Sequence, residues 1–486
     1  MSRMFSKLVA AGLLVPALCG AATPADRGES SVPVEVMSAL RAAGLPASSL
    51  GFLARRVDAP RALTALNPEQ PYMLASTTKL VTSLAALDLL GENYRWRTFA
   101  YAKGDIADER LDGDLLIVGG GDARLSSDDL LAWFRQIQSQ GLREIGGNIV
   151  LDRFAFRLTP TDHANTPLPE PSRPHHVWPD ALTLDEGLLR VEVVPTAKGR
   201  NELRMSPPLA GVQIVDRLST AGGCTAHAEM SAPGGPLKLI VSGASSPACG
   251  VQQLQFVPLS HAEFTTRAVA GLWQRAGGKL GGHVLDHSQF AGSAVRQRDA
   301  DGELEMPFST HRSDALALVM HDINKTSNNL GARNLMLSLA PGFPFESATL
   351  ADARGRVQRW LLAQGIGSGD LEIDNGSGLS RTERGKPRAM VELLCKAWRG
   401  TSAKAFVDSL PIAGVDGTLQ HRMQDGPAAG HAFLKTGTLQ DVRALAGYVR
   451  ARSGKVYAVA AMLNHPDAAT GTPVLDALIE WIAKNG

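Results

Sequence analysis

The stretch Leu74-Ala-Ser-Thr-Thr-Lys-Leu80 decides how the rest of the chain is interpreted. It opens a segment, 76–91, whose leucines recur at helical spacing and predict a helix with one face toward a core. Residues three apart share one face of a helix, so the Ser76 hydroxyl and the Lys79 amine can meet. A serine needs a base to become a nucleophile, and a lysine of lowered pKa can be that base. The pair alone also fits an N-capping serine followed by a surface lysine.

Two later motifs remove that ambiguity. The first is Ser327-Asn328-Asn329, and the second is Lys435-Thr436-Gly437, which Thr438 follows. The second motif predicts a β-strand whose glycine lets another group approach the backbone closely. In this order, the three motifs form the Ser-x-x-Lys, Ser-x-Asn, Lys-Thr-Gly set of penicillin-binding proteins and serine β-lactamases. The gap between the first two motifs is long enough to hold whole domains.

The residues around the motifs resemble one branch of these proteins, the class C low-molecular-mass penicillin-binding proteins. This branch is the D-alanyl-D-alanine carboxypeptidase/endopeptidase family, and the resemblance extends over nearly the whole chain after its N-terminal segment. The stretches that carry it, besides 74–80, are Ala86-Leu-Asp-Leu-Leu-Gly91, Val118-Gly-Gly-Gly-Asp122, Asn324-Lys-Thr-Ser-Asn-Asn329, Asp374-Asn-Gly-Ser-Gly-Leu-Ser-Arg381, Leu410-Pro-Ile-Ala-Gly-Val-Asp-Gly-Thr418 and Leu434-Lys-Thr-Gly-Thr-Leu439.

The resemblance implies an α+β fold. Its centre is a β-lactamase/transpeptidase-like domain, a five-stranded antiparallel sheet flanked by helices, built from residues 23–97 and 262–486. Inserted, mostly β domains would occupy residues 98–261. The sequence of the insert agrees, because short apolar runs at 114–118, 148–151, 189–194 and 237–241 alternate with Gly- and Pro-rich turns. One helix is predicted in the insert, near 128–140.

The resemblance also implies catalytic roles. Ser76 is the nucleophile that becomes acylated, and Lys79 is its general base. Ser327 relays a proton between Lys79 and the leaving amine, and Asn329 binds the amide backbone of the substrate. Lys435 supplies positive charge to the site and to the terminal carboxylate of the substrate.

The substrate-binding strand adds Thr436, Gly437 and Thr438. The backbone N–H groups of Ser76 and Thr438 are the predicted oxyanion donors, because one begins a helix and the other follows Gly437 on a strand. No metal and no organic cofactor is expected. The implied substrates are peptidoglycan stem peptides and cross-links, with β-lactam antibiotics as inhibitors.

The N-terminal segment predicts export. Arg3 and Lys7 precede an apolar run, 8–19, and small residues follow at 20–22, which is the layout of a secretory signal peptide over residues 1–22. The expected compartment is the periplasm, with the protein soluble or loosely associated with the membrane and without a transmembrane anchor. The formal net charge of +1 argues against nucleic acid as a partner. The sequence does not predict the oligomeric state.

Several other residues have competing interpretations. Cys224 and Cys249 are either a disulfide or two small buried thiols, whereas Cys395 is expected to be inert core. The run Gly119-Gly120-Gly121-Asp122 predicts a tight turn, and His175-His176 a solvated pair in a loop. A further group either shapes the cleft or only serves turn chemistry: Asp374, Ser377 and Asp416.

Two other functions share the three motifs. A serine β-lactamase would need an efficient water-activating residue for deacylation, which the sequence does not reveal, and the long insert argues against it. A non-catalytic penicillin-binding sensor or wall-binding scaffold would have little need for the complete set of reacting groups. The sequence therefore predicts an active serine-type hydrolase.

Overall fold

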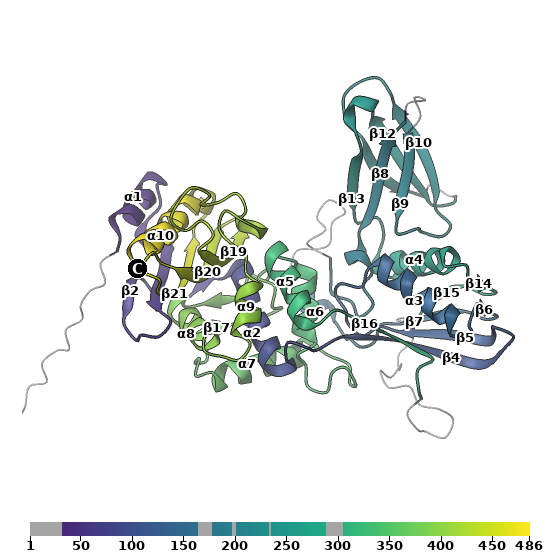
Figure 1. The fold of residues 1–486 in the computed structure, drawn as a ribbon, viewed down its shortest axis with the longest axis horizontal. Helices are drawn as coiled ribbons and strands as arrows, with labels where there is room; N and C mark the ends of the chain where they lie inside the picture. The colour runs from purple at the N-terminus through teal and green to yellow at the C-terminus, as the bar shows by residue number, and fades with distance from the viewer. Residues whose placement is uncertain (1–31, 164–176, 197–200, 233–234, 288–304) are drawn as a thin grey trace, which may run out of the picture.

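The computed structural model describes residues 32–163, 177–196, 201–232, 235–287 and 305–486. The chain forms two bodies joined near β16, and a slender β-module stands above the second body (Figure 1). The predicted signal peptide and the pair His175-His176 lie outside the described residues.

The first body is centred on a five-stranded antiparallel sheet. The strands, in spatial order, are β19 (Ala432–Leu439), β20 (Val442–Arg450), β21 (Val456–Asn464), β1 (Leu50–Arg56) and β2 (Ala62–Leu66). The antiparallel pairing of β1 with β21 brings the two ends of the described chain together. The predicted fold class, with its five-stranded antiparallel sheet, is confirmed.

Both faces of this sheet are covered, and the side chains of β20 and β21 alternate between two cores. Leu445, Val459 and Leu463 pack toward α1 (Val34–Ala42) and α10 (Thr472–Asn485). Tyr448, Ala460 and Met462 pack on the opposite side, in the core that contains α8 (Pro387–Ala397). Strands buried on both faces are apolar at nearly every position, as these two are.

The helix that carries the first motif lies inside this second core. It begins as a 3₁₀ turn (Ala75–Thr77) and continues as α2 (Thr78–Leu90). Every residue from Thr78 to Leu87 is buried, so α2 is a central helix, whereas the leucine spacing predicted one buried face. The surrounding helices are α5 (Leu316–Thr326), α6 (Asn329–Leu337), α7 (Leu350–Ala363), α8 and α9 (Ala403–Asp408). A small sheet beside them joins β3 (Tyr72–Met73), β17 (Leu371–Glu372) and β18 (Arg384–Gly385).

The second body is a mixed sheet under two helices. Its strands are β4 (Arg97–Ala107), β5 (Arg110–Val118), β6 (Glu144–Ile145), β7 (Ile149–Asp152), β14 (Lys279–Leu280), β15 (Val284–Asp286) and β16 (Ser309–Arg312). The helices α3 (Ser127–Ser139) and α4 (His261–Arg275) lie together, and Trp133, Phe134 and Trp273 fill the core between them and the sheet. Glycines 119–121 pack against neighbouring chain segments, and a Cβ on Gly120 would lie 1.8 Å from the carbonyl oxygen of Arg97.

The outer module consists of two three-stranded sheets. One joins β13 (Gln252–Phe256), β8 (Leu189–Pro195) and β9 (Asn201–Ser206), and the other joins β10 (Gln213–Ser219), β12 (Lys238–Ala244) and β11 (His227–Ser231). A disulfide links Cys224 to Cys249, which decides between the two interpretations of this pair, and Cys395 is a buried free thiol.

The chain returns from the second body to the first later than the sequence predicts. The predicted boundary is residue 262, but α4 belongs to the second core and β16 pairs with β4. We therefore propose that the second body and its module extend from about residue 97 to residue 312. Among the described residues, no helix combines the length and the hydropathy that a membrane crossing needs.

Candidate active site

The nucleophile motif sits on a strained, tightly packed turn. Ala75, just before Ser76, has a positive φ of 45°, which a residue with a side chain rarely adopts. Two glycines let neighbouring chain segments approach this turn. A Cβ on Gly378 would lie 2.0 Å from the carbonyl oxygen of Ala75, and one on Gly437 would lie 2.9 Å from that of Leu74. The backbone around Ser76 is therefore held from two sides.

Lys79 lies one turn into the helix and is fully buried. Its Nζ is 3.0 Å from Ser76 Oγ, within hydrogen-bonding distance. It also donates to Asn329 Oδ1 at 2.6 Å and to the carbonyl oxygen of Ser377 at 2.5 Å. These contacts come from three separate elements, so the lysine is fixed in position by the tertiary structure.

The other two motifs meet each other beside this pair. Lys435 on β19 is fully buried, and its Nζ donates to Ser327 Oγ at 2.8 Å and to the carbonyl oxygen of Thr436 at 3.0 Å. Ser327 ends α5 in the left-handed conformation, with φ of 62° and ψ of 36°. Backbone strain of this kind is often found at functional sites, because the surrounding structure must impose it.

The edge of β19 away from β20 lies beside the site, and a bridge between Phe433 and Ile412 covers its first residues. Within the sheet, β19 pairs only with β20, and the N–H of Leu434 donates away from that ladder to the carbonyl oxygen of Pro411. N–H groups two residues apart point to the same side of a strand, so those of Thr436 and Thr438 also point toward the open edge. The N–H of Ser76 belongs to the first turn of its helix, where N–H groups lack intrahelical acceptors.

The buried lysines have perturbed proton affinities. Burial lowers the pKa of Lys79 well below its usual value, the charge of Lys435 lowers it further, and the carboxylate of Glu383 opposes both effects. Burial also lowers the pKa of Lys435, to about 7. A lysine with a depressed pKa can be neutral near pH 7 and accept a proton, which is what a general base must do.

The three motifs line one cleft of about 420 Å³. All of the predicted site residues except Lys79 and Lys435 line this cleft. Further residues, which were not predicted as site residues, complete its wall. The predicted lining residues are Ser76, Ser327, Asn329, Thr436, Gly437 and Thr438, and the others are Thr418, Arg422, Arg443, Ala444, Thr472 and Leu475. Since Lys79 and Lys435 are bonded to lining residues, the structure brings all the predicted site residues together.

Comparison with known families identifies this architecture. Residues 34–485 match the D-Ala-D-Ala carboxypeptidase 3 (S13) family. The chain belongs to this family. The D-alanyl-D-alanine carboxypeptidase DacB of Haemophilus influenzae is 25% identical over 435 residues, covering 86% of this chain and 85% of that protein. The D-alanyl-D-alanine carboxypeptidase of an Actinomadura species is 29% identical over 397 residues, covering 79% of this chain and 71% of that protein.

Two solved structures share the fold of this chain. Penicillin binding protein 4 of Haemophilus influenzae superposes with a TM-score of 0.72 at 20% identity, covering 93% of this chain and all of that one. A predatory peptidoglycan endopeptidase of Bdellovibrio bacteriovorus has a TM-score of 0.52 at 14% identity, covering 90% and 92%. At these identities the likeness establishes the fold.

This S13 member has a buried carboxylate that the motifs did not indicate. Glu383 is fully buried and accepts the backbone N–H groups of Asp374 at 3.1 Å, Gly376 at 2.8 Å and Gly378 at 2.8 Å. These bonds fold the loop that presents the Ser377 carbonyl to Lys79. Burial, the largest influence, raises the pKa of Glu383 to about 7. Glutamate is common on surfaces, so only the tertiary structure distinguishes this one.

The residues with two interpretations are now placed. Ser377 contacts Lys79 through its carbonyl oxygen, so its loop shapes the site. Asp374 accepts the Ser380 hydroxyl within the same loop, at 2.5 Å. Asp416 accepts Lys325 Nζ at 2.6 Å and the N–H of Ile412 at 2.8 Å, which ties its turn to the end of α5, next to Ser327.

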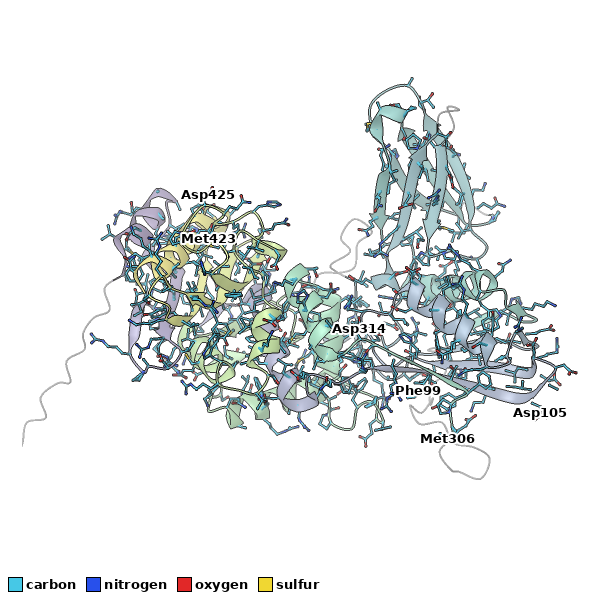
Figure 2. All side chains as sticks on the ribbon, in the orientation of Figure 1. Phe99, Asp105, Met306, Asp314, Met423 and Asp425 are labelled. Carbon is cyan, nitrogen blue, oxygen red and sulfur yellow. A yellow bond between two sulfur atoms is a disulfide. The ribbon has the colours of Figure 1, made fainter. Side chains whose placement is uncertain are left out.

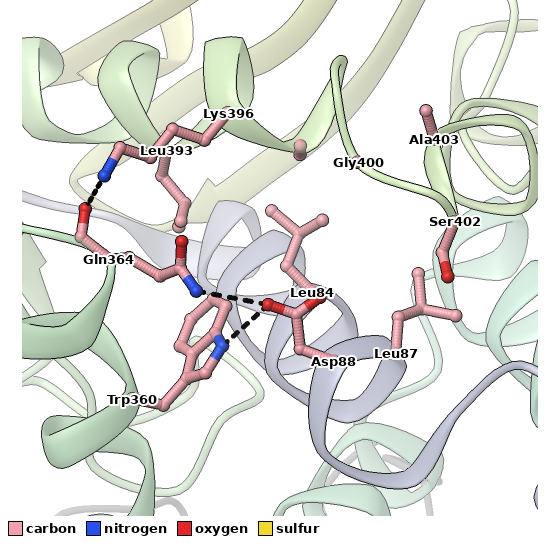
Figure 3. A pocket seen from close by; sticks show the side chains of 11 residues that line it. Leu84, Leu87, Asp88, Trp360, Gln364, Leu393, Lys396, Gly400, Ser402 and Ala403 are labelled. Atoms are coloured by element: carbon pink, nitrogen blue, oxygen red, sulfur yellow. Dashed lines mark hydrogen bonds between the residues drawn. The ribbon is translucent and has the colours of Figure 1, made fainter.

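A separate cavity of about 130 Å³ lies at the far end of α2 (Figure 3). Asp88 there accepts Trp360 Nε1 at 3.0 Å and Gln364 Nε2 at 3.2 Å, and Lys396 donates to the carbonyl oxygen of Gln364. These hydrogen bonds join α2, α7 and α8 around the cavity, so its polar side chains serve to hold the three helices together. Among the described residues, no cluster of three or more His, Cys, Asp or Glu side chains has metal-binding geometry.

Proposed function

We propose that this chain is a serine-type D-alanyl-D-alanine carboxypeptidase and endopeptidase that acts on peptidoglycan stem peptides and cross-links. The observation that carries the proposal is the 3.0 Å distance from Lys79 Nζ to Ser76 Oγ, made by a fully buried lysine. Membership of the S13 family and the DacB relatives support the substrate class.

Acylation begins when Ser76 Oγ attacks the carbonyl carbon of the penultimate D-alanine residue. Lys79 accepts the hydroxyl proton as the new C–O bond forms. The negative charge moves to the carbonyl oxygen, where the N–H groups of Ser76 and Thr438 stabilise it. Removing one such donor typically slows a reaction by about 10²–10³, so the donor pair is a large part of the catalysis.

Collapse of this intermediate breaks the C–N bond, and the leaving amine takes up the proton. We propose that Ser327 delivers it, since Ser327 Oγ is bonded to Lys435 within the same cluster of amines and hydroxyls. Water then attacks the ester carbon, its proton returns to Ser76 Oγ, and the shortened peptide leaves. In carboxypeptidase action the leaving group is D-alanine, and in endopeptidase action it is the neighbouring stem peptide.

The substrate backbone lies along the free edge of β19 as an added strand. Asn329 bonds the substrate amide, while Lys435 provides positive charge toward the terminal carboxylate. Thr436 and Thr438 offer hydroxyl groups, and the Thr436 hydroxyl is held by Thr418 Oγ1 at 2.7 Å. A β-lactam enters the same cleft and presents a strained amide to Ser76. We further propose that the protein is exported and works in the periplasm.

The test is intact-mass measurement of wild-type protein and the Ser76→Ala variant after incubation with benzylpenicillin. Digestion of cross-linked muropeptides is followed in parallel. The proposal predicts a lasting adduct on the wild type alone, together with loss of cross-links and release of D-alanine.

Each other outcome contradicts the proposal in a different way. Rapid drug turnover without a lasting adduct indicates a β-lactamase. An adduct without peptide cleavage indicates a sensor or a scaffold. An adduct of equal yield on Ser76→Ala removes Ser76 from the role of nucleophile.

A further inference from the structure

A second cleft lies where the chain passes between the two bodies. It encloses about 400 Å³ and combines three arginines with three aromatic rings: Tyr94, Arg95, Arg97, Phe99, Arg312 and Phe345. The segment 93–99 leads from the end of α2 into β4, Arg312 ends β16, and Phe345 lies in the connection between α6 and α7. Figure 2 shows Phe99 at this junction, on the lower side of the molecule.

The strand register places two of the arginines side by side. Arg97 on β4 is the direct partner of Arg312 on β16 in the antiparallel ladder. Directly opposed residues have Cβ atoms about 4.5–5.5 Å apart on one face, and like charges in this position destabilise a sheet. Phe99 is two residues from Arg97 and therefore shares that face.

The charge of this cleft is not neutralised by the described residues around it. Arg95, Arg97 and Arg312 are exposed, and within the described ranges no carboxylate lies within 4.0 Å of their guanidinium nitrogens. Arg95 is anchored by one bond to the carbonyl oxygen of Ser313, at 2.6 Å, which orients its guanidinium without cancelling its charge. Two opposed cations with no carboxylate of the described residues beside them favour a ligand that supplies the anion.

We propose that this cleft, the arginine cleft, binds a carboxylate-bearing saccharide–peptide polymer. Guanidinium groups pair with carboxylates through two parallel hydrogen bonds, so Arg97 and Arg312 together fit one carboxylate or two neighbouring ones. Aromatic rings provide flat apolar surfaces against which the C–H faces of sugar rings pack. The cleft is far larger than one inorganic ion, which favours a polymer segment.

This inference rests on the proposed function, because peptidoglycan is a polymer of this chemistry. The helix α2 has 13 residues and begins two residues after Ser76, so its other end lies about 20 Å away. The arginine cleft begins just beyond that end. A peptidoglycan chain bound there raises the effective concentration of its neighbouring stem peptides at the catalytic cleft. The cleft is therefore an exosite that favours polymeric over short substrates.

The test is binding of the protein to purified peptidoglycan sacculi by co-sedimentation, in a Ser76→Ala background that prevents digestion. Adding Arg97→Gln and Arg312→Gln should weaken binding by about tenfold or more, since each arginine contributes charge-assisted bonds. The matched control is Arg143→Gln with Arg204→Gln, which removes the same charge from two exposed arginines already paired with Glu109 and Glu202. The control should bind like the parent.

Two further measurements separate function from folding and from other ligands. The Arg97→Gln/Arg312→Gln protein should unfold at the same temperature as the parent or higher, because like charges are removed. With Ser76 restored, it should show a raised KM on sacculi, with unchanged hydrolysis of a short D-Ala-D-Ala peptide and unchanged penicillin acylation. In the competition arm, a disaccharide–tripeptide fragment should displace the protein from sacculi. Inorganic phosphate at matched ionic strength should not.

The outcomes are distinct. Unchanged binding, or equal loss in the control, overturns the exosite. Displacement by phosphate but not by the fragment also overturns it and points to a phosphate-bearing ligand. The sedimentation assay uses the Ser76→Ala protein and measures binding alone. Its result can therefore be interpreted even if the proposed catalytic activity is not found.

Discussion

The catalytic sheet and the outer module are built from strands of similar length but of opposite exposure. In β21 every residue except the two at its ends is buried, whereas in β10 no residue is fully buried. The catalytic sheet lies between two helical layers, each with its own core. The outer module contains two small sheets, and its disulfide links the β10–β11 connection to the β12–β13 connection.

The difference shows what the chemistry requires. The first body encloses Lys79 and Lys435 completely, and burial is the main cause of their lowered pKa values. A lysine on a strand as exposed as β10 would remain protonated at neutral pH. A lysine with a lowered pKa therefore requires a fully buried position, which the catalytic body provides with a helical layer on each face of its sheet. The strand β10 of the outer module offers no such position.

The largest effect should come from removing the buried base. Lys79→Met keeps the length of the side chain but abolishes proton acceptance, and should slow acylation by benzylpenicillin by about 10²–10⁴. The unfolding midpoint should stay the same or rise, because a costly buried amine is replaced by an apolar group. Stopped-flow acylation and thermal unfolding provide the two readouts. Wild-type acylation in this variant would exclude Lys79 as the base.

The next largest effect should come from matched truncations of one side chain in the catalytic sheet and one in the outer module. Leu445→Ala in the catalytic sheet should lower the free energy of unfolding by about 2–5 kcal/mol, because the methyl groups it removes are fully buried. Ile214→Ala on β10, where the side chain is 41% exposed, should change it by less than about 1 kcal/mol. Denaturant unfolding measures both. Equal effects would contradict the contrast between the two regions.

Removing the disulfide should destabilise the outer module alone. Cys224 and Cys249 are 25 residues apart, and closing a loop of that length is worth about 3.5 kcal/mol in the chain-entropy description. The Cys224→Ser/Cys249→Ser protein should show faster amide exchange in β10–β12 and unchanged penicillin acylation. Reduction of the wild type should reproduce the exchange pattern. Slower acylation would mean that the module and the catalytic cleft are coupled.

The smallest effect concerns pH. Lys79 is active when neutral, so acylation should fall as the pH drops through its lowered pKa. The charge of Lys435 contributes to that lowering, so Lys435→Met should raise the pKa of Lys79 and move the acid limb of the acylation profile to higher pH. Lys386→Met, which changes a lysine paired with Asp370, should leave the limb in place. A limb that moves to lower pH would contradict the assigned coupling.

Much of the site was predictable because its reacting groups lie in short, contiguous motifs. Ser76 and Lys79 are three apart on a helix, so their meeting follows from local geometry alone. Glu383 and Thr418 were not predictable, because their importance comes from neighbours far along the chain. The proposed extent of the second body differs from the predicted boundary at 262 for a similar reason, since helical periodicity in α4 does not reveal which core the helix joins.

The reacting groups, the strand and helix that carry them, and the family could all be predicted from the sequence. These depend on residue identity and on spacing within one element. The contacts of Lys79 with Asn329 and Ser377, the burial of both lysines and the pairing of Arg97 with Arg312 emerge only when the chain is folded. Each of these facts depends on how distant segments pack, and packing sets the local dielectric environment and the charge that surround a side chain.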